Sequence, residues 1–421
     1  MLSHIAAASS RCLRTGLQAN FLNSRSILSE SACRNRLSSL AKPSQGKSSL
    51  LSCVRCNAQK LLRGSSSAAA EAPLKGQKVV GSWLLTCAGM CFGAVVIGGI
   101  TRLTESGLSM TQWHLVKGMK PPRTDEEWAA EFERYKQFPE YKFLERDLTL
   151  EGFKNIFFWE YIHRMWGRSI GLVFALPAIY FLRKGYISKA MKPRLAIYGS
   201  LLVGQGLLGW YMVKSGLKDK SNEHEIPRVS QYRLASHLGS AFILYALFLW
   251  QGLSHILPPH QLPKTRQIAL LRKLAHSSMF AVFFTAISGA FVAGMDAGLV
   301  YNTWPKMADK WIPSDILAFE PKWKNFFENA TTVQFNHRHF AEATGAFLLG
   351  IWAYSRKVPL PPRARMAANA LAAMSLVQVG LGVWTLLSFV PTHLAATHQG
   401  GSLVLLSFAI WLTHELRRFP K

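Results

Sequence analysis

Charged side chains are scarce in this chain. Asp, Glu, Lys and Arg make up 17% of its 421 residues, whereas about a quarter is typical of soluble domains. Apolar residues make up 49%, so the composition argues against a soluble enzyme and indicates a membrane protein. The formal net charge of +26 would by itself suit nucleic-acid binding. Much of that charge lies in the N-terminal segment and in short loops between apolar runs, so no nucleic-acid partner is expected.

Acidic residues are almost absent from residues 1–75. Glu30 and Glu71 are the only two, whereas Ser, Ala, Leu and Arg are abundant. The segment also lacks the continuous apolar core of a secretory signal. This composition is typical of a mitochondrial transit peptide, so we predict that residues 1–75 are a leader that takes no part in the fold. The alternative is a disordered basic tail that the mature protein keeps.

Cysteine is missing from everything after the first apolar run. Four of the six cysteines fall in the predicted leader, namely Cys12, Cys33, Cys53 and Cys56. Cys87 and Cys91 lie one helical turn apart inside the first apolar run. This distribution argues against a disulfide framework and against a zinc or iron–sulfur site with cysteine ligands.

Long apolar runs are what the sequence does contain. A helix needs about 20 apolar residues to cross the bilayer core. Eight runs are predicted to do so: about 80–101, 157–182, 195–213, 234–256, 273–294, 334–354, 367–389 and 394–413. The loops 183–194, 257–273 and 355–366 carry Lys and Arg but no acid, whereas loop 102–156 carries both signs. By the positive-inside rule, the basic loops and both termini face the mitochondrial matrix.

The runs form two sets of four that resemble each other. Three pairs of segments match, the first with one inserted residue: "GGITRLTESGLSMTQW" (98–113) with "SGAFVAGMDAGLVYNTW" (288–304), "EYIHR" (160–164) with "QFNHR" (334–338), and "LASHLGSAFILY" (234–245) with "AATHQGGSLVLL" (395–406). An even number of spans in each half gives both halves one orientation, as in parallel repeats. We therefore predict an all-α membrane protein with eight transmembrane helices as two parallel-repeat four-helix bundles, residues 76–256 and 257–421.

Four histidines occupy equivalent points of the two halves. His163, His237, His337 and His398 each lie in the first turns of an even-numbered run, so their imidazoles should lie at similar depth near the intermembrane space. Zinc usually takes more than two protein ligands, whereas a haem iron suits two axial imidazoles. Small residues follow the histidines, and they either leave room for a flat macrocycle or let helices pack closely: Gly167, Gly171, Gly239, Gly345, Gly400 and Gly401. The pattern predicts a pair of haem ligands in each half; for a single histidine, a hydrogen bond between helices is the alternative.

The two halves differ beside the first histidine. Glu160 and His163 lie three residues apart and project from one helix face, whereas the equivalent residue of the second half is Gln334, which cannot titrate. This difference predicts a reactive haem in the first half and a spectator or electron-transfer haem in the second, unless Glu160 only caps its helix. Arg164 and Arg338 follow two of the histidines and are predicted to bind haem propionates; snorkelling to the interface is the alternative.

Over almost all of the chain after residue 75, these segments resemble the haem A synthases in their mitochondrial form. The resemblance is carried by "GGITRLTESGLSMTQWHLVKGMKPP" (98–122), "FWEYIHRMWGR" (158–168), "ASHLGSAF" (235–242), "AGMDAGLVYNTWP" (293–305), "QFNHRHFA" (334–341) and "THQGGSL" (397–403). It implies that the C8 methyl of haem O is oxidised to the formyl group of haem A for cytochrome c oxidase. The reaction would pass through an alcohol and a hydrated aldehyde.

The resemblance also implies roles for the candidate residues. Glu160 would be the catalytic carboxylate, and His163 and His237 would flank the substrate haem O. His337 and His398 would ligate a haem b cofactor. The resemblance implies a multi-pass protein surrounded by lipid of the mitochondrial inner membrane. Its expected partners are haem O synthase upstream, a ferredoxin-type electron donor and cytochrome c oxidase assembly factors. A homo-oligomer and a monomer both stay open, because the sequence does not give the oligomeric state.

Two other classes of protein stay open at this point. A di-haem cytochrome b-type electron carrier would use the same histidines and would leave Glu160 a structural role. A transporter or haem chaperone would also suit parallel repeats, but it would need ionisable residues at mid-membrane depth. An electron carrier gives no reason for a titratable group beside only one haem, so the contrast between Glu160 and Gln334 favours an enzyme.

Overall fold

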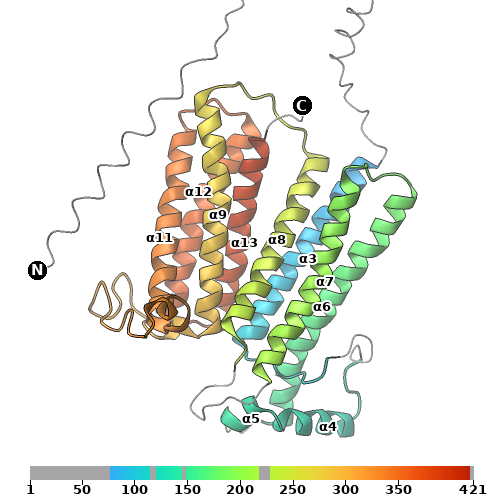
Figure 1. Cartoon of the computed structure of the whole chain (residues 1–421), viewed down its shortest axis with the longest axis vertical. Helices are drawn as coiled ribbons and strands as arrows, with labels where there is room; N and C mark the ends of the chain where they lie inside the picture. The colour runs from blue at the N-terminus through green and yellow to red at the C-terminus, as the bar shows by residue number, and fades with distance from the viewer. Residues whose placement is uncertain (1–75, 114–119, 145–147, 218–227, 418–421) are drawn as a thin grey trace, which may run out of the picture. The chain divides into compact units, whose positions relative to one another are not determined.

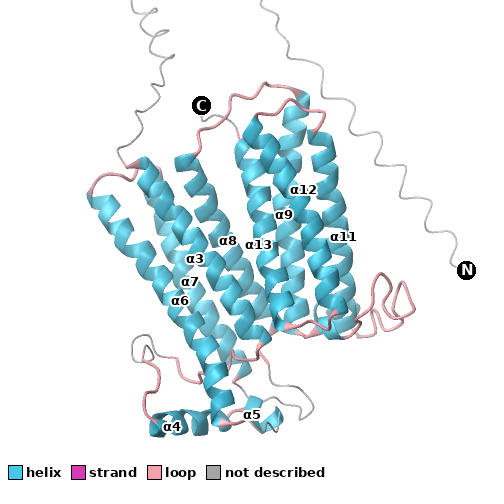
Figure 2. Ribbon diagram, turned by 180° about the vertical axis from the view of Figure 1, so that it is seen from behind, coloured by secondary structure: helices cyan, strands magenta, loops and turns pink. Residues whose placement is uncertain are grey.

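The computed structural model describes residues 76–113, 120–144, 148–217 and 228–417; the predicted leader lies outside them. Within these residues the regular elements are helices (Figures 1 and 2). The long ones are α3 (Gln77–Leu103), α6 (Leu150–Arg183), α7 (Met191–Gly216), α8 (Gln231–Ile256), α9 (Arg266–Gly294), α11 (Ala330–Ser355), α12 (Pro362–Leu387) and α13 (Thr392–Glu415). Each long helix contains most or all of one predicted apolar run, so the predicted all-α class is confirmed for the described part.

Six of these helices are long and apolar enough to cross a membrane: α3, α6, α7, α8, α9 and α12. Helices α11 and α13, with 26 and 24 residues, are long enough. Polar sequences such as "QFNHRH" and "THQGG" lower the mean hydropathy of these two helices. The structure therefore has six candidate membrane helices, and the crossing by α11 and α13 stays a prediction.

Several helices begin earlier than the apolar runs predicted. Helix α6 starts at Leu150, because the side chain of Thr149 accepts a hydrogen bond from the backbone N–H of Gly152. The side chain of Thr265 caps α9 in the same way, and that of Asn329 caps α11. Such caps satisfy backbone donors that a helix start otherwise leaves unpaired. The helices therefore extend past their apolar parts.

The long helices pack as neighbours in two groups. Helices α3, α6, α7 and α8 lie side by side, and so do α9, α11, α12 and α13 (Figures 1 and 2). The groups touch through α3 with α13 and through α8 with both α9 and α13. One buried apolar cluster runs through both groups and includes Leu84, Phe248, Leu271 and Leu371. This shared core holds the two groups in contact.

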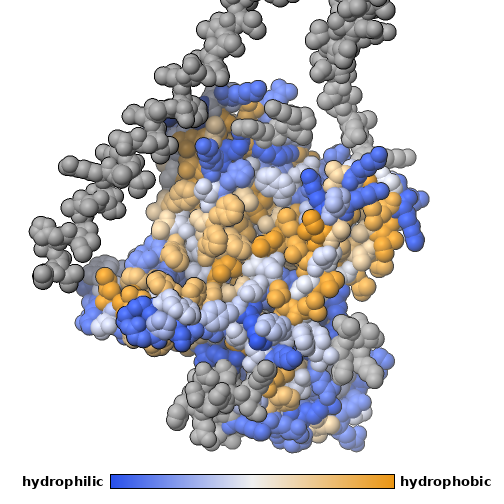
Figure 3. Space-filling view, viewed as in Figure 1, coloured by the Kyte–Doolittle hydropathy of each residue, from blue (hydrophilic) through white to orange (hydrophobic). Residues whose placement is uncertain are grey.

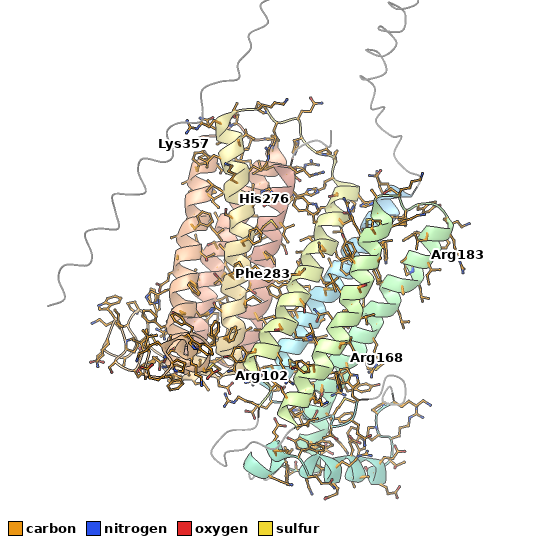
Figure 4. The ribbon with its side chains drawn as sticks, in the orientation of Figure 1. Arg102, Arg168, Arg183, His276, Phe283 and Lys357 are labelled. Atoms are coloured by element: carbon orange, nitrogen blue, oxygen red, sulfur yellow. The ribbon has the colours of Figure 1, made fainter. Side chains whose placement is uncertain are left out.

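The connections alternate between two ends of the helices. The loops 184–190, 257–265 and 356–361 lie at one end, here called the basic end; Figure 4 places Arg183 and Lys357 there. The opposite end, here called the cap end, carries α4 (Asp125–Lys136), α5 (Pro139–Leu144) and the loop 295–329. In Figure 3 an apolar band crosses the helices between these more hydrophilic ends.

Helices α4 and α5 cover the start of α6. Their aromatic side chains, with Met110 and α6, form a separate buried cluster of Met110, Phe132, Tyr135, Phe153, Ile156 and Phe157. Pro139 follows the end of α4 and opens α5, in keeping with the preference of proline for the first turn of a helix. The first four-helix group thus has a packed lid of its own at the cap end.

Candidate functional site

The four predicted histidines lie on four different helices and come together as two pairs. The ring centroids of His337 on α11 and His398 on α13 are 6.4 Å apart, and their planes make an angle of 83°. His163 on α6 and His237 on α8 are close enough to interact electrostatically. In the described part of the chain, no group of three or more His, Cys, Asp or Glu side chains converges on one point. The imidazoles are therefore arranged in twos.

Each imidazole of the first group packs against a glycine of a neighbouring helix. A Cβ atom on Gly98 of α3 would lie 2.7 Å from Cε1 of His163. One on Gly209 of α7 would lie 3.4 Å from Cε1 of His237. The first position has no room for a side chain unless the ring moves.

The second group repeats this arrangement. A Cβ atom on Gly289 of α9 would lie 3.0 Å from Cε1 of His337, and one on Gly382 of α12 would lie 2.9 Å from Cε1 of His398. Close-packed interiors do not absorb such an added atom without a shift. These four glycines, rather than those that follow the histidines, make the space that the rings occupy.

Most of the glycines considered from the sequence pack between helices instead. Cβ atoms on four of them would meet side chains of neighbouring helices: Gly239, Gly345, Gly400 and Gly401. Gly167 and Gly171 have no atom of another element within 4 Å of such a Cβ. The close-packing alternative therefore describes the first four.

The second pair of histidines is oriented by polar side chains. Nδ1 of His337 lies 2.8 Å from Oγ of Ser288, and that hydroxyl donates its own hydrogen to the carbonyl of Thr285 at 2.7 Å. The hydroxyl must therefore accept from Nδ1–H, which leaves Nε2 of His337 with a free lone pair. Nδ1 of His398 lies 3.1 Å from the side-chain amide of Gln378, which also donates to the His398 carbonyl at 2.8 Å.

The first pair has no such support within the described residues. Nδ1 of His163 and Nδ1 of His237 are both buried and have no hydrogen-bond partner there. Gln205, which stands four residues before Gly209 as Gln378 stands before Gly382, donates to the carbonyl of His237 at 3.4 Å and to Ser240 at 2.8 Å. It holds the backbone of α8 but not the imidazole.

The separation of the second pair suits two imidazoles that bind one metal ion. Imidazoles on opposite sides of one metal ion, with bonds of about 2 Å and ring centres roughly 1 Å beyond each nitrogen, have centroids about 6 Å apart. The 6.4 Å separation of His337 and His398 meets this requirement. The free lone pair on His337 Nε2 meets the second requirement, a neutral imidazole of defined tautomer.

Glu160 is held by a set of hydrogen-bond donors. Its side chain is 3% exposed. Oε2 accepts from the hydroxyl of Ser109 at 2.7 Å and from the backbone N–H of Met110 at 2.6 Å, and Oε1 accepts from Arg164 at 2.5 Å. Because α6 begins at Leu150, Glu160 lies well inside the helix, and the helix-cap alternative is wrong.

Gln334 occupies the equivalent point of the second group, but its surroundings have the opposite polarity. Its side-chain amide donates to the carbonyls of Gly298 and Tyr301, at 3.3 and 3.0 Å, and its Oε1 accepts from Arg338 at 3.4 Å. The loop after α9 therefore presents acceptors where the loop after α3 presents donors to Glu160. Each loop therefore matches its partner: donors bind the carboxylate of Glu160, and acceptors bind the amide of Gln334.

The two predicted propionate partners both fold back onto these loops. Arg164 donates to the carbonyls of Met110 and Gln112, at 2.8 and 2.9 Å. Arg338 donates to carbonyls of the second loop in the same manner. The side chain of Arg164 is only 8% exposed, so snorkelling does not describe it. Whether either arginine also binds a propionate stays a prediction.

A hollow of about 340 Å³ lies beside Arg164 at the cap end. Trp113, Trp210 and Lys214 contribute to its wall. The guanidinium of Arg164 lies 4.6 Å from the Trp113 ring centroid, and the ammonium of Lys214 lies 4.9 Å from that of Trp210. Two cations stacked on two indoles suit a flat, partly apolar ligand that carries acidic groups.

Comparison with known proteins places these features in a family. The family model described as cytochrome oxidase assembly protein, COX15-CtaA, matches residues 81–410. The chain is 59% identical to "Heme A synthase COX15" of Homo sapiens over 345 residues, which cover 82% of this chain and 84% of the human protein. It is 49% identical to "Heme A synthase COX15" of Arabidopsis thaliana over 347 residues, 82% of this chain and 76% of that protein. It is 45% identical to "Heme A synthase" of Nitrosospira multiformis over 344 residues, 81% of this chain and 94% of that protein. The chain therefore belongs to the haem A synthase family of cytochrome oxidase assembly proteins.

Proposed function

We propose that this chain is an oxidoreductase that converts haem O to haem A for cytochrome c oxidase. The observation that carries the proposal is the contrast between Glu160 and Gln334. Two pairs of histidines have matching glycine surroundings, but the buried residue three positions before the first histidine is a carboxylate, Glu160, in one half and an amide, Gln334, in the other. A chain that only carried electrons between two haems would not need this difference, so the electron-carrier alternative is not favoured.

His337 and His398 would hold a resident haem b. Their separation, the lone pair on His337 Nε2 and the glycine surfaces behind both rings fit that group. When bound, haem b supplies one-electron redox chemistry. Ser288 would accept from Nδ1–H of His337 and keep that ring oriented, as second partners of metal-bound histidines do. The side-chain NH2 of Gln378 donates to the His398 carbonyl and lies against Nδ1 of the same residue, so it would position that part of α13.

His163 and His237 would flank the substrate haem O. Trp113, in the wall of the hollow beside Arg164, and the ring of His237 both lie within 4 Å of a Cβ on Gly209. We assign the acidic groups of the substrate to Arg164 and Lys214 in this hollow. Both cations are already stacked on tryptophan rings, so little side-chain ordering would be needed when the substrate binds. Trp113 and Trp210 would contact the macrocycle.

Glu160 would accept protons from the substrate. The oxidation half-reaction is R–CH3 + H2O → R–CHO + 4 H+ + 4 e−; a one-electron acceptor must take the electrons, and each oxidation step releases protons that a nearby base must take. A positioned carboxylate is such a base. The hydroxyl of Ser109 and the N–H of Met110 fix the orientation of the carboxylate, and Arg164 balances its charge.

The membrane arrangement follows from the same comparison of halves. We propose that all eight long helices cross the mitochondrial inner membrane as two parallel repeats, residues 76–256 and 257–421, with both termini in the matrix. Support comes from the basic loops, which all lie at one end of the helices. Support also comes from the equivalent glycine and arginine contacts of the two halves. Haem O synthase, a ferredoxin-type donor and cytochrome c oxidase assembly factors would be the partners.

The test is the variant Glu160→Gln, purified with its haems. Loss of a general base typically slows a reaction by about 100-fold or more, so haem O should accumulate and haem A should fall by at least that factor. The haems are extracted and identified by mass. Glu133→Gln, at an exposed position of α4, serves as the matched control and should leave conversion unchanged. Normal formation of haem A in the Glu160 variant would refute the assignment of Glu160.

A further inference from the structure

A second buried carboxyl lies close to Glu160 at the cap end. Glu140 stands on α5, in the lid over the first four-helix group, and is 7% exposed. Its Oε2 accepts a hydrogen bond of 3.0 Å from the hydroxyl of Tyr135 on α4, which is fully buried. The lid thus contains a buried acid bonded to a buried phenol, and the reaction proposed above assigns no role to either group.

The surroundings of Glu140 connect it to the site. Three elements bring charged or titratable groups to it: Tyr135 from α4, Arg102 from α3 and Glu160 from α6. Met110 links the two acids, because its N–H binds Glu160 and its side chain lies in the same buried cluster as Tyr135. Arg102 is itself paired with Asp296 at 3.0 Å.

These contacts also set the proton affinity of Glu140. The pKa of this carboxyl is raised to about 7, mainly because the group is buried, and the charge of Glu160 contributes in the same direction. The hydrogen bond from Tyr135 and the positive charge of Arg102 lower it and do not cancel the effect of burial. Glu140 is therefore poised to gain or lose a proton near neutral pH, unlike an exposed glutamate.

We propose that Glu140 is the proton acceptor for Glu160 and passes protons from the site toward the cap end. In the step, the proton of the Glu160 carboxylic acid moves to the Glu140 carboxylate, which leaves Glu160 ionised and Glu140 neutral; no electron moves. Glu160 is thereby restored as a base for the next oxidation step. The inference rests on the proposed function, because that reaction is the source of the protons.

Infrared spectroscopy of the purified protein tests the coupling without any turnover. In pH-difference spectra, the wild-type protein should show a carboxylic acid band that titrates near pH 7, and Glu140→Gln should lack it. Glu160→Gln should move the midpoint of that band downward, and Tyr135→Phe should move it upward, because each variant removes one of the named influences. Glu133→Gln, an exposed change on the same lid, should leave the band unaltered.

The pH dependence of haem A formation tests the role itself. An ionised Glu140 is needed to accept the proton, so the wild-type rate should rise as pH increases through about 7. Glu140→Gln should be slower and should lose that rise. A band that is absent from the wild type, or a midpoint that Glu160→Gln leaves unchanged, would overturn the inference. Wild-type protein that makes no haem A would refute the proposed function instead, while leaving the titration data intact.

Discussion

The glycine behind His398 provides a sharp test of the proposed haem b site. We expect that Gly382→Ala weakens haem binding and that Gly380→Ala does not. A Cβ on Gly382 would lie 2.9 Å from Cε1 of His398, whereas a Cβ on Gly380, on the same helix, would have no atom of another element within 4 Å. The two substitutions are chemically identical and differ only in what the added methyl group meets.

The size of the effect follows from the contact distance. Ordinary contact for such an atom begins at 3.4 Å, so the ring of His398 must move by about 0.5 Å (3.4 − 2.9). Metal–ligand distances tolerate only about 0.2 Å, and disturbed support of a metal ligand typically costs about 10- to 100-fold in affinity. That range corresponds to roughly 1.4 to 2.7 kcal/mol. Without haem, the ring can turn aside, so the fold itself should tolerate the methyl group.

The assay is haem b bound per protein, measured by titrating haem into each purified variant. Thermal unfolding in detergent accompanies it, because alanine stabilises a helix by about 1 kcal/mol relative to glycine, and Gly380→Ala should not unfold earlier than wild type. Affinity of Gly382→Ala equal to that of the wild type would refute the reasoning. Equal losses in both variants would do so as well, because the contact with His398 could not then be the cause.

Three further outcomes are expected. Ser288→Ala removes the acceptor of His337 Nδ1–H and should lower haem b affinity by about tenfold, measured in the same titration. Gln334→Glu would set a carboxylate against two loop carbonyls and should lower the free energy of unfolding by about 1 to 3 kcal/mol; unchanged thermal unfolding would contradict the reversed polarity. Glu415→Gln at the basic end removes the buried negative charge that faces Arg363 and His260. Because Arg363 is partly exposed, the expected loss is about 2 kcal/mol, visible as earlier thermal unfolding.

The sequence was sufficient to predict the long helices and to identify the four equivalent histidines. The length and apolar content of a segment predict a membrane helix. Alignment of the two halves of a repeat identifies their equivalent residues from the sequence alone. The starts of α6 and α9 were harder, since these helices continue into polar sequence up to the caps at Thr149 and Thr265. Apolar content marks the membrane part of a helix but not its end.

The glycines that face the imidazoles could not be identified without the structure. Glycine has no side chain whose character could indicate its role in the sequence. That role depends on which ring of another helix lies opposite. One signal was present: Gln205 precedes Gly209 by the same spacing as Gln378 precedes Gly382. The alignment of segment 98–113 with segment 288–304 also needs no inserted residue. Gly98 and Gly289 stand at equal distances before Glu105 and Asp296, which both have a φ of 52°.

The sequence likewise did not predict which loop offers hydrogen-bond donors and which offers acceptors, because this depends on which backbone groups the loop turns inward. Only part of it has a counterpart in sequence. Ser109, whose hydroxyl binds Glu160, corresponds to Val300 in the second loop, which has no hydroxyl. The N–H of Met110 and the carbonyl of Tyr301 come from corresponding backbone positions that face their partners differently.

The differences between the two halves all favour a firmly held cofactor in the second half and a reacting substrate in the first. Both halves have glycines behind the imidazoles and an arginine bound to the loop. These shared features would suit a haem in either half. In the second half, Ser288 and Gln378 also fix the imidazoles, and an amide replaces the carboxylate. In the first half, Nδ1 of each imidazole has no such partner within the described residues, and the carboxylate of Glu160, the proposed base, stands three residues before His163. A cofactor must stay bound and unreacted, whereas a substrate must react and then leave. Firm ligands with no base suit the first requirement, and less firmly oriented ligands beside a base suit the second.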